Sequence, residues 1–174
     1  MRATAARHRR QKGQNLIEFA ISLLLLLIIL LGIMDFGYLF SGYISAHNAV
    51  RGAARFAATH PSAWTNASDP PDMTTIEGNL KLTAVPAVIP NDDAHVTITY
   101  FVPTSGSRNG VQCGKYLPST GFVASSTYSQ ATCVTPGNLV QIQAVYIYTF
   151  MTPMLQQTFH STTITASALE FIEG

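Results

Sequence analysis

Charged residues are scarce in this sequence, and the basic ones gather at one end. Only 11% of the 174 residues are charged, and five of the ten Lys and Arg residues precede Gly13. From Gln14 onward five basic and nine acidic residues remain, a net charge of −4. A nucleic-acid-binding domain presents a basic patch or stripe, and none is left outside the amino-terminal run. We therefore expect no nucleic-acid partner.

No charged residue occurs between Glu18 and Asp35, where the sequence reads FAISLLLLLIILLGIM. The apolar character extends over residues 16–40. A helix of about 20 such residues crosses the bilayer core, and Lys and Arg just before the span keep that end in the cytoplasm. We predict a single-pass membrane helix, with a cytoplasmic amino terminus and an extracytoplasmic carboxyl-terminal domain.

Two other interpretations of the apolar run fit less well. A cleaved secretory signal has a shorter apolar core followed by a small-residue cut site. Here the run is long and continues as MDFGYLFSGY. A buried helix of a soluble protein is also a poor match, because an almost pure Leu/Ile block follows five positive charges.

The chain has only two cysteines, Cys113 and Cys133, and both follow the apolar run. If the amino terminus is cytoplasmic, both lie in an oxidising compartment, where two cysteines favour one disulfide. Such a bond contributes about 3 kcal/mol in the chain-entropy description. The alternative is a pair of free thiols.

The sequence lacks the common catalytic motifs. It has no Gly-x-Ser-x-Gly, no P-loop and no His-Glu-x-x-His, and its five histidines are scattered. Residues 91–93, Asn-Asp-Asp, offer oxygens to calcium, but a solvated turn is the better interpretation. We expect a protein that is not an enzyme and needs no metal or other cofactor.

Proline is absent between the apolar run and Pro61, so the helix should continue outside the membrane and end near Thr59. At about 1.5 Å per residue, residues 14–59 would form roughly 70 Å of helix. One face of its outer half repeats small or apolar residues at spacings of three and four: Leu39, Gly42, Ala46, Ala49, Val50, Ala53, Phe56 and Ala57. We expect this face to pack on the chain's own sheet, on neighbouring subunits, or on each along a different length.

The residues after Pro61 favour a β-rich domain. Residues 62–79 are rich in Pro, Ser, Thr and Asp and predict a loop, whereas residues 80–90 and 94–102 are typical of strands. Residues 103–137 predict a long loop or hairpin held by the two cysteines. We expect Trp64 to pack on the sheet as a lid.

The strongest strand pattern is LVQIQAVYIYTF at residues 139–150, and residues 159–171 would return as its partner. We predict an α+β fold, in which a long N-terminal transmembrane and amphipathic helix packs on a small, mostly antiparallel sheet of about four strands. The chain then divides into a basic leader at 1–13, the helix at 14–60 and the extracytoplasmic β-rich domain at 61–174.

Four segments carry a resemblance to a known family. They are GQNLIEFA at 13–20, GIMDFGYLF at 32–40, AVRGAARFAA at 49–58 and, more loosely, the last 36 residues. The chain resembles the TadE-like family, the pseudopilins or minor pilins of the tight-adherence (Flp-type) pilus machinery. It differs in having Tyr38 where a basic residue is usual and in lacking a proline in the apolar block. The related TadF and TadG types therefore stay open, although TadG chains are usually much longer.

The resemblance implies a protein of the bacterial inner membrane with a processing site at the cytoplasmic end of the helix. A membrane prepilin peptidase would cut after Gly13, recognise Glu18 and leave Gln14 as the new amino terminus. In assembled pilins of this class the glutamate meets the freed amine of a neighbouring subunit. The partners implied are the prepilin peptidase, other pilins or pseudopilins, pilus assembly proteins and membrane lipid. The simpler alternative for Glu18 is a helix cap that reaches the interface.

Three other functions compete with this one. A membrane-anchored adhesin or sensor domain would keep its leader, and an anchored hydrolase would need a nucleophile motif that the sequence lacks. A type II secretion pseudopilin would share the processing site. The strand-rich ending and the segment at 49–58 resemble the tight-adherence set instead.

Overall fold

The computed structural model describes the backbone of residues 4–65, 72–107 and 109–174, and side chains from Gln14 onward within these ranges. The chain forms two compact units. The anchor unit comprises Met1–Tyr38 and Phe150–His160, and the outer unit comprises Leu39–Thr149 and Ser161–Gly174.

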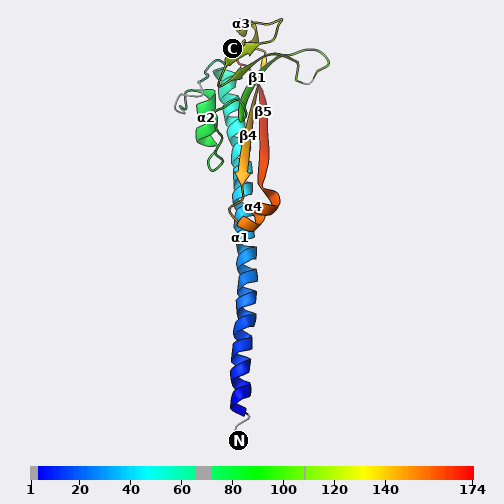
Figure 1. Ribbon diagram of the computed structural model, residues 1–174. Coiled ribbons are helices and arrows are strands. Elements are labelled where there is room, and N and C mark those ends of the chain that lie inside the picture. Colours follow the sequence, from blue (N-terminus) through cyan, green and yellow to red (C-terminus); the bar gives the residue numbers. More distant parts are fainter. Residues whose placement is uncertain (1–3, 66–71, 108) are drawn as a thin grey trace. The chain divides into compact units, whose positions relative to one another are not determined.

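Helix α1 (Thr4–Thr59) is the longest element of the described chain (Figure 1). It ends at the predicted residue but begins ten residues earlier than the predicted helix, because Ala, Arg, Gln and Lys in the leader are good helix formers. Within the outer unit it buries Gly42, Ala46, Ala49, Val50, Ala53 and Ala57, as the spacing predicted. Leu39 and Phe56 of the same face are half-buried.

The outer unit contains a five-stranded antiparallel sheet of order β3-β2-β1-β4-β5. The strands are β1 (Val96–Val102), β2 (Val111–Leu117), β3 (Gly121–Ala124), β4 (Leu139–Thr149) and β5 (Ser161–Phe171). This confirms the α+β class, with one strand more than expected. Strands β4 and β5 run alongside the outer part of α1 (Figure 1).

The register of β4 places its alternate apolar residues on the helix side of the sheet. Ile142 faces Ile98 of β1, and Ala144 faces Ala166 of β5. The predicted inward set is buried throughout: Val140, Ile142, Ala144, Tyr146, Tyr148 and Phe150. A two-residue period therefore identified both the strand and its buried face.

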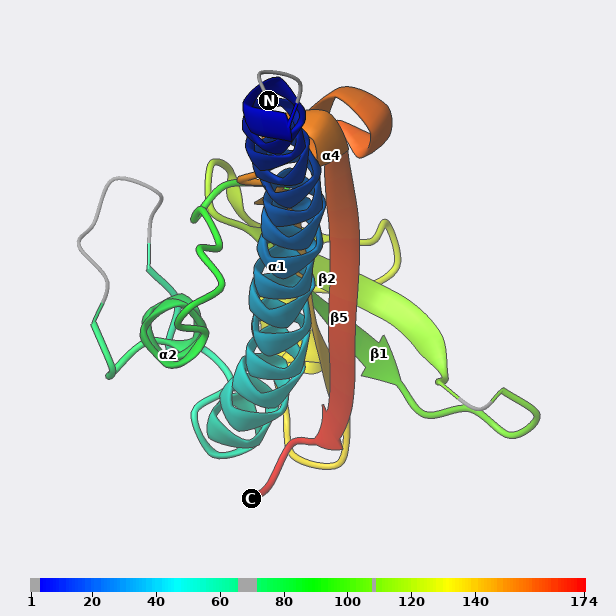
Figure 2. The ribbon, with the colours of Figure 1, turned by 90° about the horizontal axis from the view of Figure 1, so that it is seen from below.

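The strand predicted at residues 80–90 is wrong. Helix α2 (Ile76–Thr83) occupies its first half and the end of the predicted loop at 62–79, part of which lies outside the described residues. The Thr75 side chain caps α2 by accepting the N–H of Gly78 at 3.2 Å. Ile76 and Leu80, four positions apart, bury one face. In both views α2 and β5 lie on opposite sides of the outer part of α1 (Figure 2).

The predicted loop at 103–137 is a structured hairpin in the described part of the chain. It contains β2, β3 and the short helix α3 (Gln130–Cys133), and a disulfide joins Cys113 of β2 to Cys133 with their Cα atoms 5.7 Å apart. The predicted disulfide is therefore confirmed. Both cysteines are fully buried, so the bond fixes the base of this hairpin inside the core.

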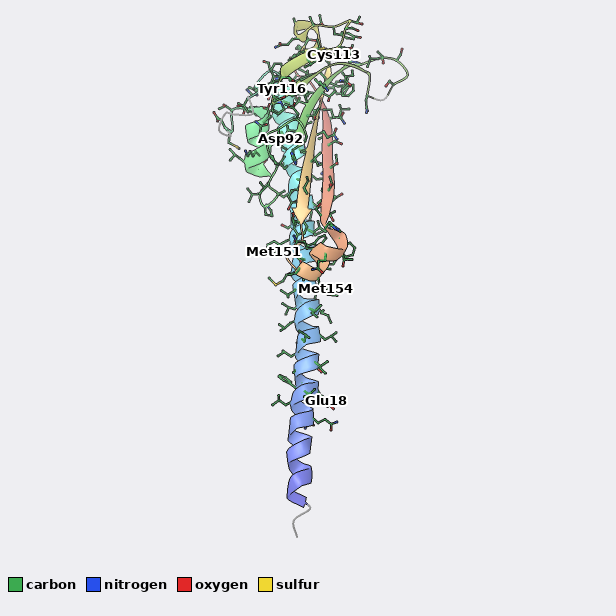
Figure 3. The ribbon with its side chains drawn as sticks, in the orientation of Figure 1. Glu18, Asp92, Cys113, Tyr116, Met151 and Met154 are labelled. Carbon is green, nitrogen blue, oxygen red and sulfur yellow. A yellow bond between two sulfur atoms is a disulfide. The ribbon has the colours of Figure 1, made fainter. Side chains whose placement is uncertain are left out.

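Trp64 packs on the sheet, as predicted. Its ring stacks on Tyr116 at a centroid distance of 4.8 Å, and its Nε1–H donates to the Tyr100 hydroxyl at 2.8 Å. The Tyr100 hydroxyl donates in turn to the carbonyl of Pro61. These contacts tie the chain that follows α1 to β1 and β2. Figure 3 marks Tyr116 and Cys113 in this region.

Candidate functional site

The predicted processing residues lie on α1. Gly13 and Gln14 are helical, and Glu18 follows one turn after Gln14. The Gln14 Nε2 donates to the Glu18 Oε1 at 3.2 Å, and both side chains are exposed. Figure 3 shows Glu18 projecting from the side of the helix. The carboxylate is therefore open to a partner from outside the chain.

The apolar run after Glu18 has the length and composition of a membrane span. Helix Gln14–Thr59 contains a window of mean hydropathy 2.9 in which no residue is buried. Its leucines and isoleucines are about half exposed, so they face the surroundings of the protein rather than a core of its own. Such a surface requires an apolar medium or a neighbouring helix.

Asp35, the first charge after the run, is buried at 2% exposure. Its Oδ1 accepts the backbone N–H of Met151 at 2.9 Å, and its Oδ2 accepts the N–H of Thr152 at 2.8 Å. Thr152 is the N-cap of helix α4 (Pro153–Phe159). A carboxylate beside a helix amino terminus satisfies free N–H groups and interacts well with the helix dipole. Asp35 therefore fastens the β4–β5 connection to α1.

A groove lies beside this attachment. It has a volume of about 260 Å³ and is lined by Leu31, Met34, Asp35, Tyr38, Met151, Thr152 and Pro153. Phe36 and Phe150 pack edge to face nearby, with ring centroids 6.4 Å apart. Apart from Asp35 and two hydroxyls, the lining is apolar. The groove suits hydrocarbon better than a polar substrate.

A second buried acid lies in the outer unit. Glu77, at the start of α2, is 2% exposed, and its Oε2 accepts the N–H of Thr65 at 3.2 Å. Burial raises the pKa of this carboxyl to about 7. The bond joins α2 to the chain that follows α1, which is a structural role.

The predicted turn at residues 91–93 forms around Asp92. Its carboxylate accepts the N–H groups of Ala94 and His95, each at 3.0 Å, and pairs with the His95 ring at 2.6 Å. The His95 contact lowers the pKa of Asp92. Asp93 instead bonds the hydroxyl and N–H of Ser119. Within the described ranges, no group of three or more His, Cys, Asp or Glu side chains is arranged to hold a metal ion.

Residues 13–55 match the family model of TadE-like proteins. The match confirms the resemblance over a segment that contains Gly13, Glu18 and Asp35. No curated protein and no solved structure matches the chain. The TadE-like segment carries an apolar helix able to span a membrane, and the family indicates a role connected with the tight-adherence pilus and its assembly partners.

Sequence reasoning missed the role of Asp35. The residue lies in the TadE-like segment, and its position as the first charge after sixteen uncharged residues was visible. No pattern in the sequence indicated which residues Asp35 would bind, because Met151 and Thr152 are more than a hundred positions away.

Proposed function

We propose that this protein is a pseudopilin or minor pilin of a tight-adherence (type IVc) pilus, processed by a prepilin peptidase and acting in pilus assembly. The observation that carries the proposal is the TadE-like match, which begins at Gly13 and includes Glu18 at the start of the apolar helix. The protein would be a substrate and structural subunit, with no catalytic activity of its own.

The chemistry at the helix start supports this order of events. Hydrolysis of the Gly13–Gln14 bond adds water, leaves a carboxylate on Gly13 and frees the α-amine of Gln14. The leader takes Arg2, Arg7, Arg9, Arg10 and Lys12 with it, so the basic cytoplasmic extension is lost. Glycine at the scissile bond suits a narrow active site, since it has no side chain and weakens the helix that must open there.

Glu18 is the group that the new amine would pair with. The Gln14–Glu18 contact indicates that one helical turn separates the two, and the exposed carboxylate is equally accessible to the amine of a second subunit. A carboxylate at the hydrocarbon boundary is costly unless it is paired. An intermolecular pair would therefore both relieve this cost and fix the axial register between neighbouring helices.

The decisive experiment is intact-mass spectrometry of the chain expressed with the prepilin peptidase of its host. We expect the loss of residues 1–13, and no loss when the peptidase is catalytically inactive. Gly13→Leu should block the cut, whereas Gly32→Leu should not, because a Cβ at Gly32 would point into open space. A chain that keeps residue 1 beside active peptidase would favour the unprocessed adhesin or sensor.

A second measurement tests assembly separately from cleavage. Glu18→Ala should abolish or sharply reduce piliation in a strain that lacks the native gene. Glu173→Ala, which removes an exposed acid of the outer unit and keeps the backbone hydrogen bond to Ala58, should leave it unchanged. Normal piliation with Glu18→Ala would refute the role given to this carboxylate.

A further inference from the structure

The segment Phe150–His160, in the connection between β4 and β5, is free of charge and unusually apolar on its surface. The sequence has no Asp, Glu, Lys or Arg between Lys115 and Glu170. Helix α4 contributes no buried residue. The exposed fractions of Met151, Met154 and Phe159 are 75%, 64% and 55%. Met151 lines the groove beside Asp35 and Phe159 contacts Phe150, yet more than half of each of the three side chains faces outward.

This segment is held against one part of α1. Asp35 accepts two of its backbone N–H groups, the Phe150 ring contacts Phe36, and the groove is shared with residues 31–38. That part of α1 is itself apolar outside the contact, since Met34, Phe36 and Tyr38 are each about half exposed. Figure 3 shows Met151 and Met154 at this level of the helix. One apolar surface therefore runs from the apolar helix onto α4.

The length of the uncharged run places this surface at a membrane boundary. Glu18 and Asp35 are seventeen residues apart, which is roughly 26 Å of helix at about 1.5 Å per residue. The hydrocarbon core is about 30 Å thick. If Glu18 lies at one edge of the hydrocarbon, Asp35 lies near the other, and the segment that covers Asp35 lies at the same depth.

We propose that Phe150–His160 is a membrane-interface segment, with Met151, Met154 and Phe159 immersed at the glycerol and upper acyl level of the outer leaflet. An amphipathic helix at an interface buries its apolar face by about 5–10 Å. Gln156, Gln157 and His160 supply polar groups for the headgroup region. Asp35 holds the segment in place, and the segment in turn shields the carboxylate from lipid.

Lipid is a better occupant of this surface than a second copy of the chain. The surface is continuous with the uncharged stretch of α1 between Glu18 and Asp35, whose exposed leucines and isoleucines require an apolar medium. It also lacks the charged groups that commonly give a protein partner its register. The consequence is that the segment fixes the depth of α1, so that extraction of the subunit must also remove α4 from lipid.

The proposal rests on α1 spanning the membrane, and not on leader cleavage or pilus assembly. Cys113 and Cys133 are bonded to each other, so one introduced cysteine can be labelled selectively with a polarity-sensitive fluorophore. We would label Met154→Cys, Leu25→Cys and Arg55→Cys in the full chain. Each would be reconstituted in phosphatidylcholine vesicles at a low protein-to-lipid ratio. Leu25 is a mid-span reference, and Arg55 is an exposed reference twenty residues beyond Asp35.

We expect the fluorophore at position 154 to be quenched more strongly by a quencher near the lipid headgroup than by one deep in the acyl chains. Leu25 should show the opposite order, and iodide in the buffer should quench Arg55 but not Met154. Iodide quenching of Met154 equal to that of Arg55, with Leu25 still quenched by lipid, overturns the proposal. Shielding of Met154 that appears only at high protein density also overturns it and assigns the surface to a second copy. A Leu25 label that no lipid quencher reaches refutes the membrane span and the proposal with it.

Discussion

Asp35 and Thr152 lie 117 positions apart, and the Asp35 carboxylate accepts the Thr152 backbone N–H at 2.8 Å. Thr152 is the N-cap of α4, yet its own side chain makes no capping hydrogen bond. Asp35, from another helix, instead accepts the backbone N–H of the N-cap residue itself and that of the residue before it. Through this bond the TadE-like segment, which ends at residue 55, determines the position of a connection near the other end of the chain.

Removing this carboxylate should release the connection. In Asp35→Ala the amides of Met151 and Thr152 lose hydrogen bonds to a charged group, which contribute about 1.5–3 kcal/mol each. We expect their hydrogen exchange to accelerate by roughly 10- to 100-fold. Exchange mass spectrometry of peptides covering residues 150–160, with the full chain in detergent micelles, measures this.

The matched control for this experiment is Asp93→Ala. Asp93 also accepts a backbone N–H, that of Ser119 at 2.9 Å, but in the outer unit. It should accelerate exchange near Ser119 and leave residues 150–160 unchanged. Equal exchange of residues 150–160 in wild type and Asp35→Ala would show that other contacts hold the connection.

Much of the fold could be predicted from the sequence where one period dominates. The face of α1 from Gly42 to Ala57 repeats at three and four, and every second residue from Val140 to Phe150 is apolar, so both buried faces were found. The prediction failed at residues 80–90, where Val85, Val88 and Ile89 gave a β-rich composition without alternation. Thr75 and the Ile76–Leu80 spacing were the overlooked signs of α2, in a segment whose polar composition had suggested a loop.

Of the candidate site, the part that belongs to a local motif could be predicted from the sequence, and the part that depends on a long-range contact could not. The sequence was informative about Gly13 and Glu18, because both belong to one local motif ahead of an apolar run. The Asp35 attachment depends on the return of the chain after the fourth strand, β4, and no local pattern encodes that pairing. Every residue except proline has a backbone N–H, so the identity of the donor residue does not reveal a long-range hydrogen bond of this kind.

Two glycines of α1 should respond in opposite directions to alanine. A Cβ at Gly42 would lie 2.7 Å from the Tyr146 Cε1, whereas a Cβ at Gly52 meets only the Asn79 Oδ1 at 3.8 Å. Gly52→Ala should stabilise the outer unit by about 0.5–1 kcal/mol through helix propensity. Gly42→Ala should instead destabilise it, because overpacking costs about 1–3 kcal/mol.

Urea unfolding of both glycine variants, followed by the fluorescence of Trp64, compares them directly. The pair controls for helix propensity, because both glycines lie inside α1 and receive the same methyl group. Equal changes in unfolding free energy would contradict the close packing of Gly42 against Tyr146.

Loss of the disulfide should weaken the outer unit without removing the sheet. The cysteines are 20 positions apart, and closing a loop of this length stabilises the folded chain by about 3 kcal/mol. We expect the Cys113→Ala, Cys133→Ala double variant to unfold at a lower urea concentration and to become insensitive to reductant. Wild type should shift toward the variant when reduced. An unchanged urea midpoint in the variant would contradict this account.

Glu77 should make the outer unit less stable as the pH rises from about 4.5 to about 7. Burial raises the pKa of its carboxyl from 4.5 to about 7, so in this window the unfolded chain has released a proton that the folded chain keeps. Its contribution to stability is therefore highest below pH 4.5, falls by up to about 3 kcal/mol and levels off above pH 7. Glu77→Gln does not titrate, so its stability relative to wild type should increase with pH, while the exposed control Glu173→Gln should show no such trend. Urea midpoints across the window measure both differences, and a pH-independent difference for Glu77→Gln would show that this carboxyl titrates normally.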